Sequence, residues 1–222
     1  MRLRDTYDVP EDVAAGPHSP AFAKFLWNWF GDTRAVTHGE LDLTFLDELT
    51  LEERALAREL IRRNLKLKYN HIIEGASALH DLDAAPILQR MLREEPDISR
   101  RLVMAGALWK LNRSPVFIEC LEEAKSKLGS IFQFGHLGQV LWLGDERAVD
   151  FLIDLLAVND WGVQSMTLGL LNELEFGRRM GIPAGKMPHQ PADYRKMRGD
   201  PTFRAQMVAA IQARNAQSKN GW

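Results

Sequence analysis

One phrase of sequence occurs three times in this chain, once clearly and twice in weakened form. The clearest copy, at residues 143–156, reads LGDERAVDFLIDLL; the weaker copies read LDAAPILQRML at 82–92 and LNRSPVFIECL at 111–121. Each has a short polar turn followed by apolar residues at the i, i+3, i+4, i+7 spacing of one helix face. Each also follows another apolar helical run. The pattern predicts a helix pair that is repeated along the chain.

The spacing of the copies predicts the architecture. Alignment at the end of the first helix of each pair makes four residues equivalent, at a mean interval of about 31 residues: His80, Trp109, Leu141 and Asn172. No strand-like alternation interrupts residues 69–180. Because one helix pair cannot bury its apolar side alone, neighbouring pairs must stack. We therefore predict an all-α fold, an α-solenoid in which helix pairs form a right-handed superhelix between non-repeat helical caps.

Composition divides the chain into three predicted parts. Residues 1–49 contain prolines and a short aromatic segment, AFAKFLWNWF, and are predicted to form an N-terminal arm and cap. Burial of this segment against the first repeat is favoured over a membrane-interface anchor, because it is short and lacks a basic face. Residues 50–180 are predicted to form the repeat domain. Residues 181–222 carry seven Lys or Arg against two acids and are predicted to be a loop and a basic C-terminal helix.

Thr50-Leu51-Glu52-Glu53 has the pattern of a capping box and predicts that a helix begins there and runs to about Leu65. Its apolar side is predicted to contain Leu51, Ala55, Ala57, Leu60 and Ile61. The charged remainder is predicted to be a solvated face, formed by Glu52, Glu53, Arg58, Glu59, Arg62 and Arg63. The apolar stripes of the repeats predict four further core residues: Cys120, Leu121, Leu152 and Leu155.

The copy at 143–156 resembles the bacterial HEAT-like repeat, of the kind also found in phycobilisome lyases. The residues that carry the resemblance are, in order, Gly144, Asp145, Arg147, Ala148 and Val149. Asp160 and Val163 match the next junction of that family, whereas Gln164 stands where the family prefers arginine. The resemblance covers roughly residues 70–180, with one strong copy and two weak ones. It implies a fold, and a fold alone does not give a function.

The composition narrows the class of function. A formal net charge of −2 gives no global reason for affinity to nucleic acid or to a membrane surface. The one cysteine, Cys120, lies in an apolar stripe and is interpreted as a small buried hydrophobe. No apolar run approaches the ~20 residues that span a bilayer, and the first residues do not have the pattern of a secretory signal. We expect a cytoplasmic protein.

The sequence shows no signature of catalysis or metal binding. Its six histidines form no H-E-x-x-H pattern and no pairing with cysteine at ligand spacing. The common hydrolase and nucleotide-binding patterns are absent as well. We therefore expect a protein that is not an enzyme and that needs no cofactor and no metal.

Solenoids usually function by presenting a binding surface to a partner. We therefore expect the first helices of the pairs to form a shallow concave face that binds a protein. Tryptophan and arginine dominate the residues that contribute most to interfaces. The predicted partner-binding residues are Arg101, Trp109, Gln133, Trp142, Trp161 and Gln164. The alternative for the tryptophans is that they fill the space between stacked helices.

Three classes of partner follow from these observations. The first is a protein, and small bacterial solenoids of this kind include immunity proteins that neutralise a secreted toxin. The second is nucleic acid, which HEAT-type DNA glycosylases bind, although they need a strongly basic groove that this composition does not offer. The third is a chromophore, by analogy with the lyases, which would require a nucleophile or ligand pocket that the sequence does not display.

Overall fold

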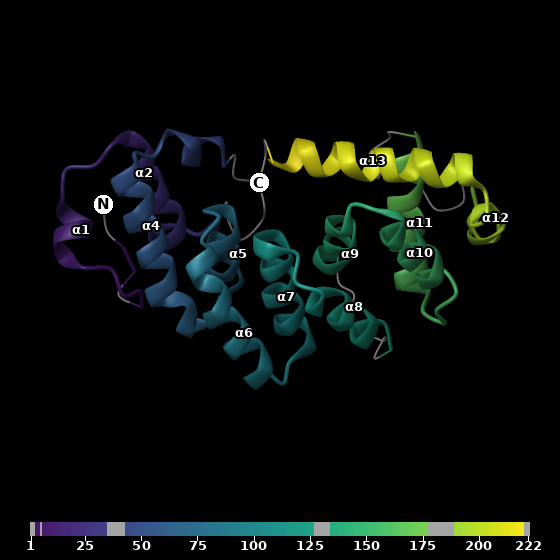
Figure 1. The fold of residues 1–222 in the computed structure, drawn as a ribbon, viewed down its shortest axis with the longest axis horizontal. Coiled ribbons are helices and arrows are strands. Elements are labelled where there is room, and N and C mark those ends of the chain that lie inside the picture. Colours follow the sequence, from purple (N-terminus) through teal and green to yellow (C-terminus); the bar gives the residue numbers. More distant parts are fainter. Residues whose placement is uncertain (1–2, 5, 35–42, 127–133, 177–188, 220–222) are drawn as a thin grey trace. The chain divides into compact units, whose positions relative to one another are not determined.

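The computed structural model describes residues 3–4, 6–34, 43–126, 134–176 and 189–219 (Figure 1). Every regular element in these ranges is helical, so the prediction of an all-α fold is confirmed for the described residues. The chain divides into two compact units. Unit 1 contains residues 1–120 with 218–222, and unit 2 contains residues 121–217. The division between them falls inside the predicted repeat domain, 50–180.

Unit 1 begins with short elements that enclose an aromatic cluster. They are α1 (Glu11–Ala15), α2 (Pro20–Leu26), a π-helical turn (Trp27–Gly31) and a 3-10 turn (Thr44–Glu48). The indole Nε1 of Trp29 donates a hydrogen bond to the His71 carbonyl at 3.1 Å, which attaches the cluster to the first repeat. The predicted burial of the aromatic segment is confirmed for Phe22, Phe25, Leu26, Trp29 and Phe30.

The predicted capping box is confirmed at the start of α4 (Leu51–Asn64). The Thr50 hydroxyl accepts from the Glu53 amide, and the Glu53 carboxylate accepts from the Thr50 amide, both at 3.1 Å. The same carboxylate also accepts from the amide and the hydroxyl of Ser19, both at 3.0 Å. Since Ser19 is the N-cap of α2, Glu53 joins the starts of two helices.

Thr50→Ala is expected to lower the free energy of unfolding by about 0.5–2 kcal/mol. The substitution leaves the Glu53 amide without its hydroxyl acceptor at the start of α4. Chemical denaturation of the parent and the variant measures the effect, with Thr50→Ser as the control that retains the hydroxyl. Equal stability of all three proteins would show that the cap contributes nothing.

The predicted sides of α4 need correction in two respects. Ala57, Leu60 and Ile61 are buried as expected, but Leu51 and Ala55 are exposed, so the buried side of α4 begins only at Ala57. Two arginines predicted to be solvated instead contact the turn after the next helix. Arg58 Nε donates to the Leu79 carbonyl at 2.9 Å, and Arg62 Nη1 pairs with the buried Asp81 carboxylate at 2.5 Å.

The repeated helix pairs of unit 1 follow α4. They are α5 (Asn70–Ala78) with α6 (Ala85–Glu94), and α7 (Ile98–Asn112) with α8 (Val116–Ser126), whose last residues belong to unit 2. Helix α5 packs against α4 and α7, and α7 also packs against α6. Figure 1 shows α4, α5 and α7 side by side.

The turn inside each pair corrects the predicted register. His80 and Arg113 both adopt the left-handed conformation, with φ of 50° and 58°, directly after the first helix of their pair. The residues equivalent to His80 are therefore Arg113 and Gly144, and not Trp109 and Leu141. The sequence alignment placed this boundary one helical turn too early, because the apolar stripe of α7 runs on without a break up to Trp109.

Unit 2 contains the third pair, α9 (Phe134–Val140) and α10 (Glu146–Leu155), with a 3-10 turn (Leu141–Leu143) between them. Gly144 ends that turn with φ of 74°, a conformation that glycine adopts without strain. The Asp145 side chain then accepts from the Arg147 amide at 3.0 Å and starts α10. These contacts explain locally why Leu-Gly-Asp separates two helices.

The rest of unit 2 consists of α11 (Trp161–Phe176), α12 (Pro191–Met197) and α13 (Pro201–Lys219). The predicted C-terminal helix is thus preceded by a second, shorter helix. The four predicted core residues are confirmed, since Cys120 and Leu121 are buried in α8, and Leu152 and Leu155 in α10.

Candidate interaction surface

The predicted partner-binding residues of unit 1, Arg101 and Trp109, lie on α7 in different environments. Arg101 is half-buried in the first turn. Trp109 is only 6% exposed, and its ring lies 6.0 Å from that of Phe117. Every side chain from Leu102 to Trp109 is buried, because α7 has helices packed against more than one side. Trp109 is therefore a packing residue, which corrects its assignment to an accessible face.

The predicted residues of unit 2 are more accessible. Trp142 lies in the 3-10 turn and is half-buried. Trp161 is 78% exposed and is the first residue of α11. Gln164 is half-buried one turn later, and its amide donates to the Val158 carbonyl at 2.6 Å. Gln133 lies outside the described residues. The structure thus brings Trp161 and Gln164 together on one turn of helix.

The start of α11 holds Trp161 in a defined position. The Asp160 carboxylate accepts from the Val163 amide at 2.9 Å, which caps the helix. Val163 is buried and anchors the opposite side of the same turn. Because α11 is fixed by its cap, by Val163 and by the Gln164 hydrogen bond, the indole is presented from a rigid support. An exposed tryptophan in such a position is a candidate contact residue.

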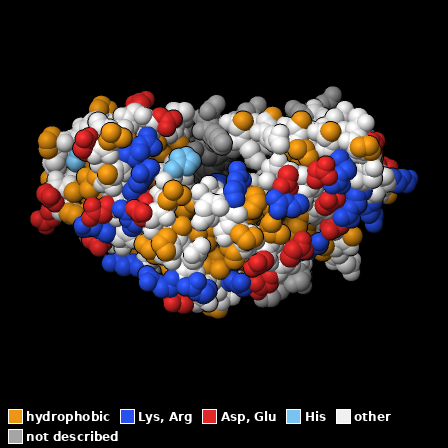
Figure 2. All heavy atoms as spheres, in the orientation of Figure 1, with side chains coloured by type: hydrophobic (Ala, Val, Ile, Leu, Met, Phe, Trp, Pro, Cys, Tyr) orange, Lys and Arg blue, Asp and Glu red, His pale blue; other side chains and the backbone are white. Residues whose placement is uncertain are grey.

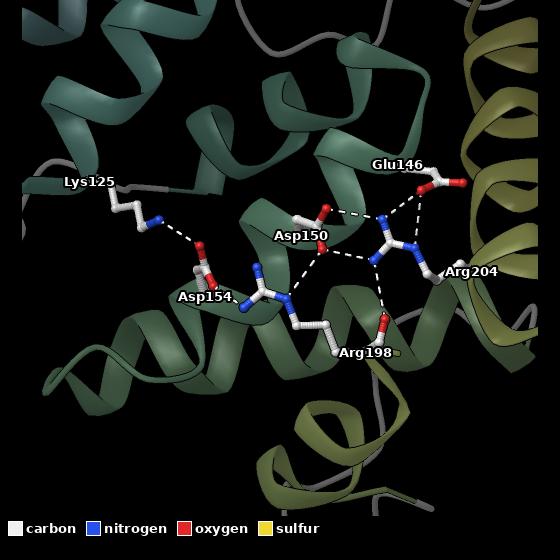
Figure 3. Close-up of polar contacts among 6 residues, drawn as sticks. All are labelled: Lys125, Glu146, Asp150, Asp154, Arg198 and Arg204. Atoms are coloured by element: carbon white, nitrogen blue, oxygen red, sulfur yellow. Dashed lines mark hydrogen bonds and ion pairs between the residues drawn. The ribbon is translucent and has the colours of Figure 1, made fainter. Parts of the chain in front are cut away.

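A second feature of unit 2, an acidic ladder on α10, was not predicted. We use this name for Glu146, Asp150 and Asp154, which are spaced by four residues and therefore lie along one face of the helix. Arg204 of α13 bonds to Glu146 at 2.7 Å and to Asp150 at 2.8 and 3.0 Å (Figure 3). Arg198 bonds to Asp150 at 3.3 Å and to Asp154 at 2.6 Å.

Lys125 of α8 completes this network at 2.8 Å from Asp154. The hydrogen bond from Arg204 is the main reason that the pKa of Asp150 lies below its usual value. Burial alone would raise the pKa of Asp154, but its bonds to Lys125 and Arg198 outweigh burial and leave the pKa lowered. Asp150 and Asp154 are therefore charged at neutral pH and attract the basic C-terminal segment. The four-residue spacing of acids and the surplus of basic residues after 181 were the sequence signals for this contact.

Amide side chains of α13 add contacts to the turn before α10. Asn215 donates to the Leu141 carbonyl at 2.6 Å, and Gln212 donates to the Gly144 carbonyl at 3.1 Å. The Leu141 carbonyl also accepts from the Gly144 amide at 3.0 Å, so the Asn215 amide is its second donor, and the Gly144 carbonyl lies just beyond the end of the 3-10 turn. Helix α13 thus lies across the helix pair and satisfies part of its turn.

No family model, curated protein or solved structure matches the chain. Within the described ranges, no group of three His, Cys, Asp or Glu side chains is arranged to hold a metal ion. None of the helices described has the length and apolar character needed to cross a membrane. Two features remain for a functional interpretation, the exposed start of α11 and the acidic ladder.

Proposed function

We propose that this protein is a non-catalytic interaction module built as a HEAT-like α-solenoid, and that it binds a protein partner. Three features support the solenoid. Helix pairs follow one another in sequence, the first helices α5 and α7 pack together, and a left-handed residue ends the first segment of three successive pairs. In such an architecture each repeat contacts its neighbours and the remaining surface is available to a partner.

Trp161 is the observation that carries the proposal. At 78% exposure it is the most exposed large aromatic side chain among the described residues. The exposed indole does not gain the free energy that burial would provide, which is about 25 cal/mol for each Å² of apolar surface. A partner that covers Trp161 recovers this free energy, and Gln164 beside it supplies a polar contact. We place the centre of the interface at the first turn of α11.

A protein partner is favoured over nucleic acid because of how the charges are distributed. Figure 2 shows acidic and basic side chains interspersed on the face in view. The basic C-terminal segment is the best candidate for a phosphate-binding surface, but Arg198, Arg204 and Arg214 are paired there with carboxylates. Binding of nucleic acid needs Lys or Arg side chains that are free to neutralise phosphates and so release the counterions of the nucleic acid. A toxin neutralised by this protein is one partner of the favoured class.

Trp161→Ala is expected to remove binding of the partner while leaving the fold intact. Loss of a central tryptophan costs more than about 2 kcal/mol at an interface hot spot, which corresponds to a roughly thirtyfold weaker complex. The measurement is affinity capture from the native lysate with the parent and the variant as baits, followed by quantitative mass spectrometry. The captured protein is then titrated against both baits by calorimetry.

Leu82→Ala is the matched control, because Leu82 is also a large apolar side chain, 63% exposed, but lies in unit 1. This variant should retain the partner. Equal loss in both variants would indicate non-specific hydrophobic capture and contradict the proposal. Recovery of nuclease-sensitive material or a chromophore in place of a protein would contradict it as well.

A further inference from the structure

The C-terminal segment from His189 to Gln217, here called the C-terminal arm, contacts the remainder of unit 2 in two ways. The first is apolar: four side chains spaced along α12 and α13 are buried, namely Tyr194, Phe203, Met207 and Ile211. The second is ionic, since Arg198 and Arg204 bind the acidic ladder of α10 (Figure 3). The arm therefore has the character of an amphipathic basic helix bound to an acidic and apolar face.

The arm is less firmly attached than the helices beneath it. In the described part of α13, about one side chain per turn is buried, whereas α10 buries six of its ten residues. The pairs of Arg198 are open to solvent, with the Arg198 side chain 46% and the Asp150 side chain 36% exposed, whereas the Arg204 side chain is 17% exposed. Such pairs contribute little in water and weaken with salt. Segments with few buried contacts open locally before the rest of a structure does.

Unpaired polar atoms weaken the same interface. The hydroxyl of Tyr194 and Oε2 of Glu175 are both buried, and neither makes a hydrogen bond. Burial, together with the nearby Glu175 carboxylate, raises the pKa of Tyr194. Buried polar groups without partners destabilise the state that buries them. Undocking of α12 would return both groups to water.

We propose that the C-terminal arm is an autoinhibitory strap. It occupies a binding face, formed by the acidic ladder and the apolar surface beside it, that can accept a helix of another protein in place of the arm. The ligand has the chemistry of the arm itself: an amphipathic helix with two arginines next to an apolar stripe. The residues of this face are not those assigned to the surface around Trp161, and the proposal does not depend on the function assigned to that tryptophan.

The strap sets the apparent affinity for such a helix. A ligand that needs the vacant face binds more weakly in proportion to the fraction of molecules in which the face is vacant. If the arm is docked in about 99% of molecules, a competing helix binds about 100-fold more weakly than it would to the open face. Weakening the protein's own arm must therefore strengthen binding of the same helix added separately.

The test uses the full-length protein and a fluorescent peptide of residues 189–216, followed by anisotropy. The double variant Arg198→Glu/Arg204→Glu undocks the arm in the chain but leaves the ladder unchanged, so it should bind the peptide at least about tenfold more tightly than the parent. A peptide that carries the same two substitutions should not bind. Addition of salt should weaken the complex, because its charges are partly exposed.

Arg195→Glu/Lys196→Glu is the matched control, since it makes the same change in charge on two exposed residues of α12 that do not contact the ladder. Its affinity for the peptide should equal that of the parent. Hydrogen exchange of the Arg198→Glu/Arg204→Glu protein should show faster exchange in α12 and α13 and unchanged protection in α10 and α11. Loss of protection across all four helices would overturn the proposal, because the arm would then be part of the fold. Equal peptide affinity of the parent and this variant would overturn it too.

Discussion

Leu152→Ala is expected to lower the free energy of unfolding by about 2–5 kcal/mol, the range measured for leucine truncation in protein cores. Leu152 is completely buried at the centre of α10, between Phe151 and Ile153, which are buried as well. The substitution removes apolar contacts and leaves a cavity that the surrounding helices can close only in part. Urea denaturation followed by circular dichroism at 222 nm measures the loss.

Leu51→Ala is the control for this prediction, because Leu51 is 84% exposed in the first turn of α4. Its truncation should change the free energy of unfolding by less than about 0.5 kcal/mol, as is usual for surface positions. The two leucines are the same in chemistry and differ in burial. A free energy of unfolding for Leu152→Ala equal to that of the parent would show that α10 does not face the core in this way.

Arg62→Ala is expected to cost about 3 kcal/mol at neutral pH. Arg62 pairs at 2.5 Å with Asp81, whose side chain is only 2% exposed, and a second oxygen of that carboxylate has no hydrogen bond. Removal of the guanidinium leaves a buried charge without its cation, which is costlier than the loss of a surface ion pair. Arg63→Ala is the matched control, because Arg63 forms an exposed pair with Glu59 and should matter by about 0.5 kcal/mol or less.

The cost of Arg62→Ala should depend on pH in a defined direction. Burial raises the pKa of Asp81 above its usual value even beside Arg62, and loss of the guanidinium raises it further. A carboxyl group whose pKa is raised in the folded state binds a proton more readily there than in the unfolded chain. The destabilisation of the folded state by its buried charge therefore decreases as the pH falls through that pKa. The difference between parent and variant should shrink from neutral toward acidic pH. A penalty that is constant or grows on acidification would contradict this account of Asp81.

The two arginines were indistinguishable by pattern, since both lie on the charged side of α4 and both were predicted to be solvated. What distinguishes them is the position of the turn at Asp81, which lies nineteen residues after Arg62 in the chain. Helical periodicity records which residues share a face of one helix. It does not record which neighbouring segment approaches that face, so the buried partner of Arg62 could be recognised only in the folded structure.

Tryptophan burial was decided in the same way. Trp109 and Trp161 both fit an interface or a packing role by sequence, yet one is 6% and the other 78% exposed. Trp109 lies in the last turn of a helix that has others packed around it, whereas Trp161 begins α11 on the side of the turn opposite the buried Val163. The role of the acidic ladder could likewise be recognised only in the folded structure. The arginines of the C-terminal arm that bind it lie more than forty residues away in the sequence.

Short sequence patterns were sufficient to predict several local features of the fold. The capping box of Thr50 and Glu53, the glycine turn before α10 and the apolar stripes with Leu152 and Leu155 follow from contacts within a few residues, which short patterns encode. Tertiary structure alone decided the register of the turn at Arg113, the burial of Trp109, the pairing of Arg62 and the docking of the C-terminal arm. These features depend on the packing of segments that are distant in sequence. The free energy of that packing comes from the apolar surface and the charges that the two segments together remove from water.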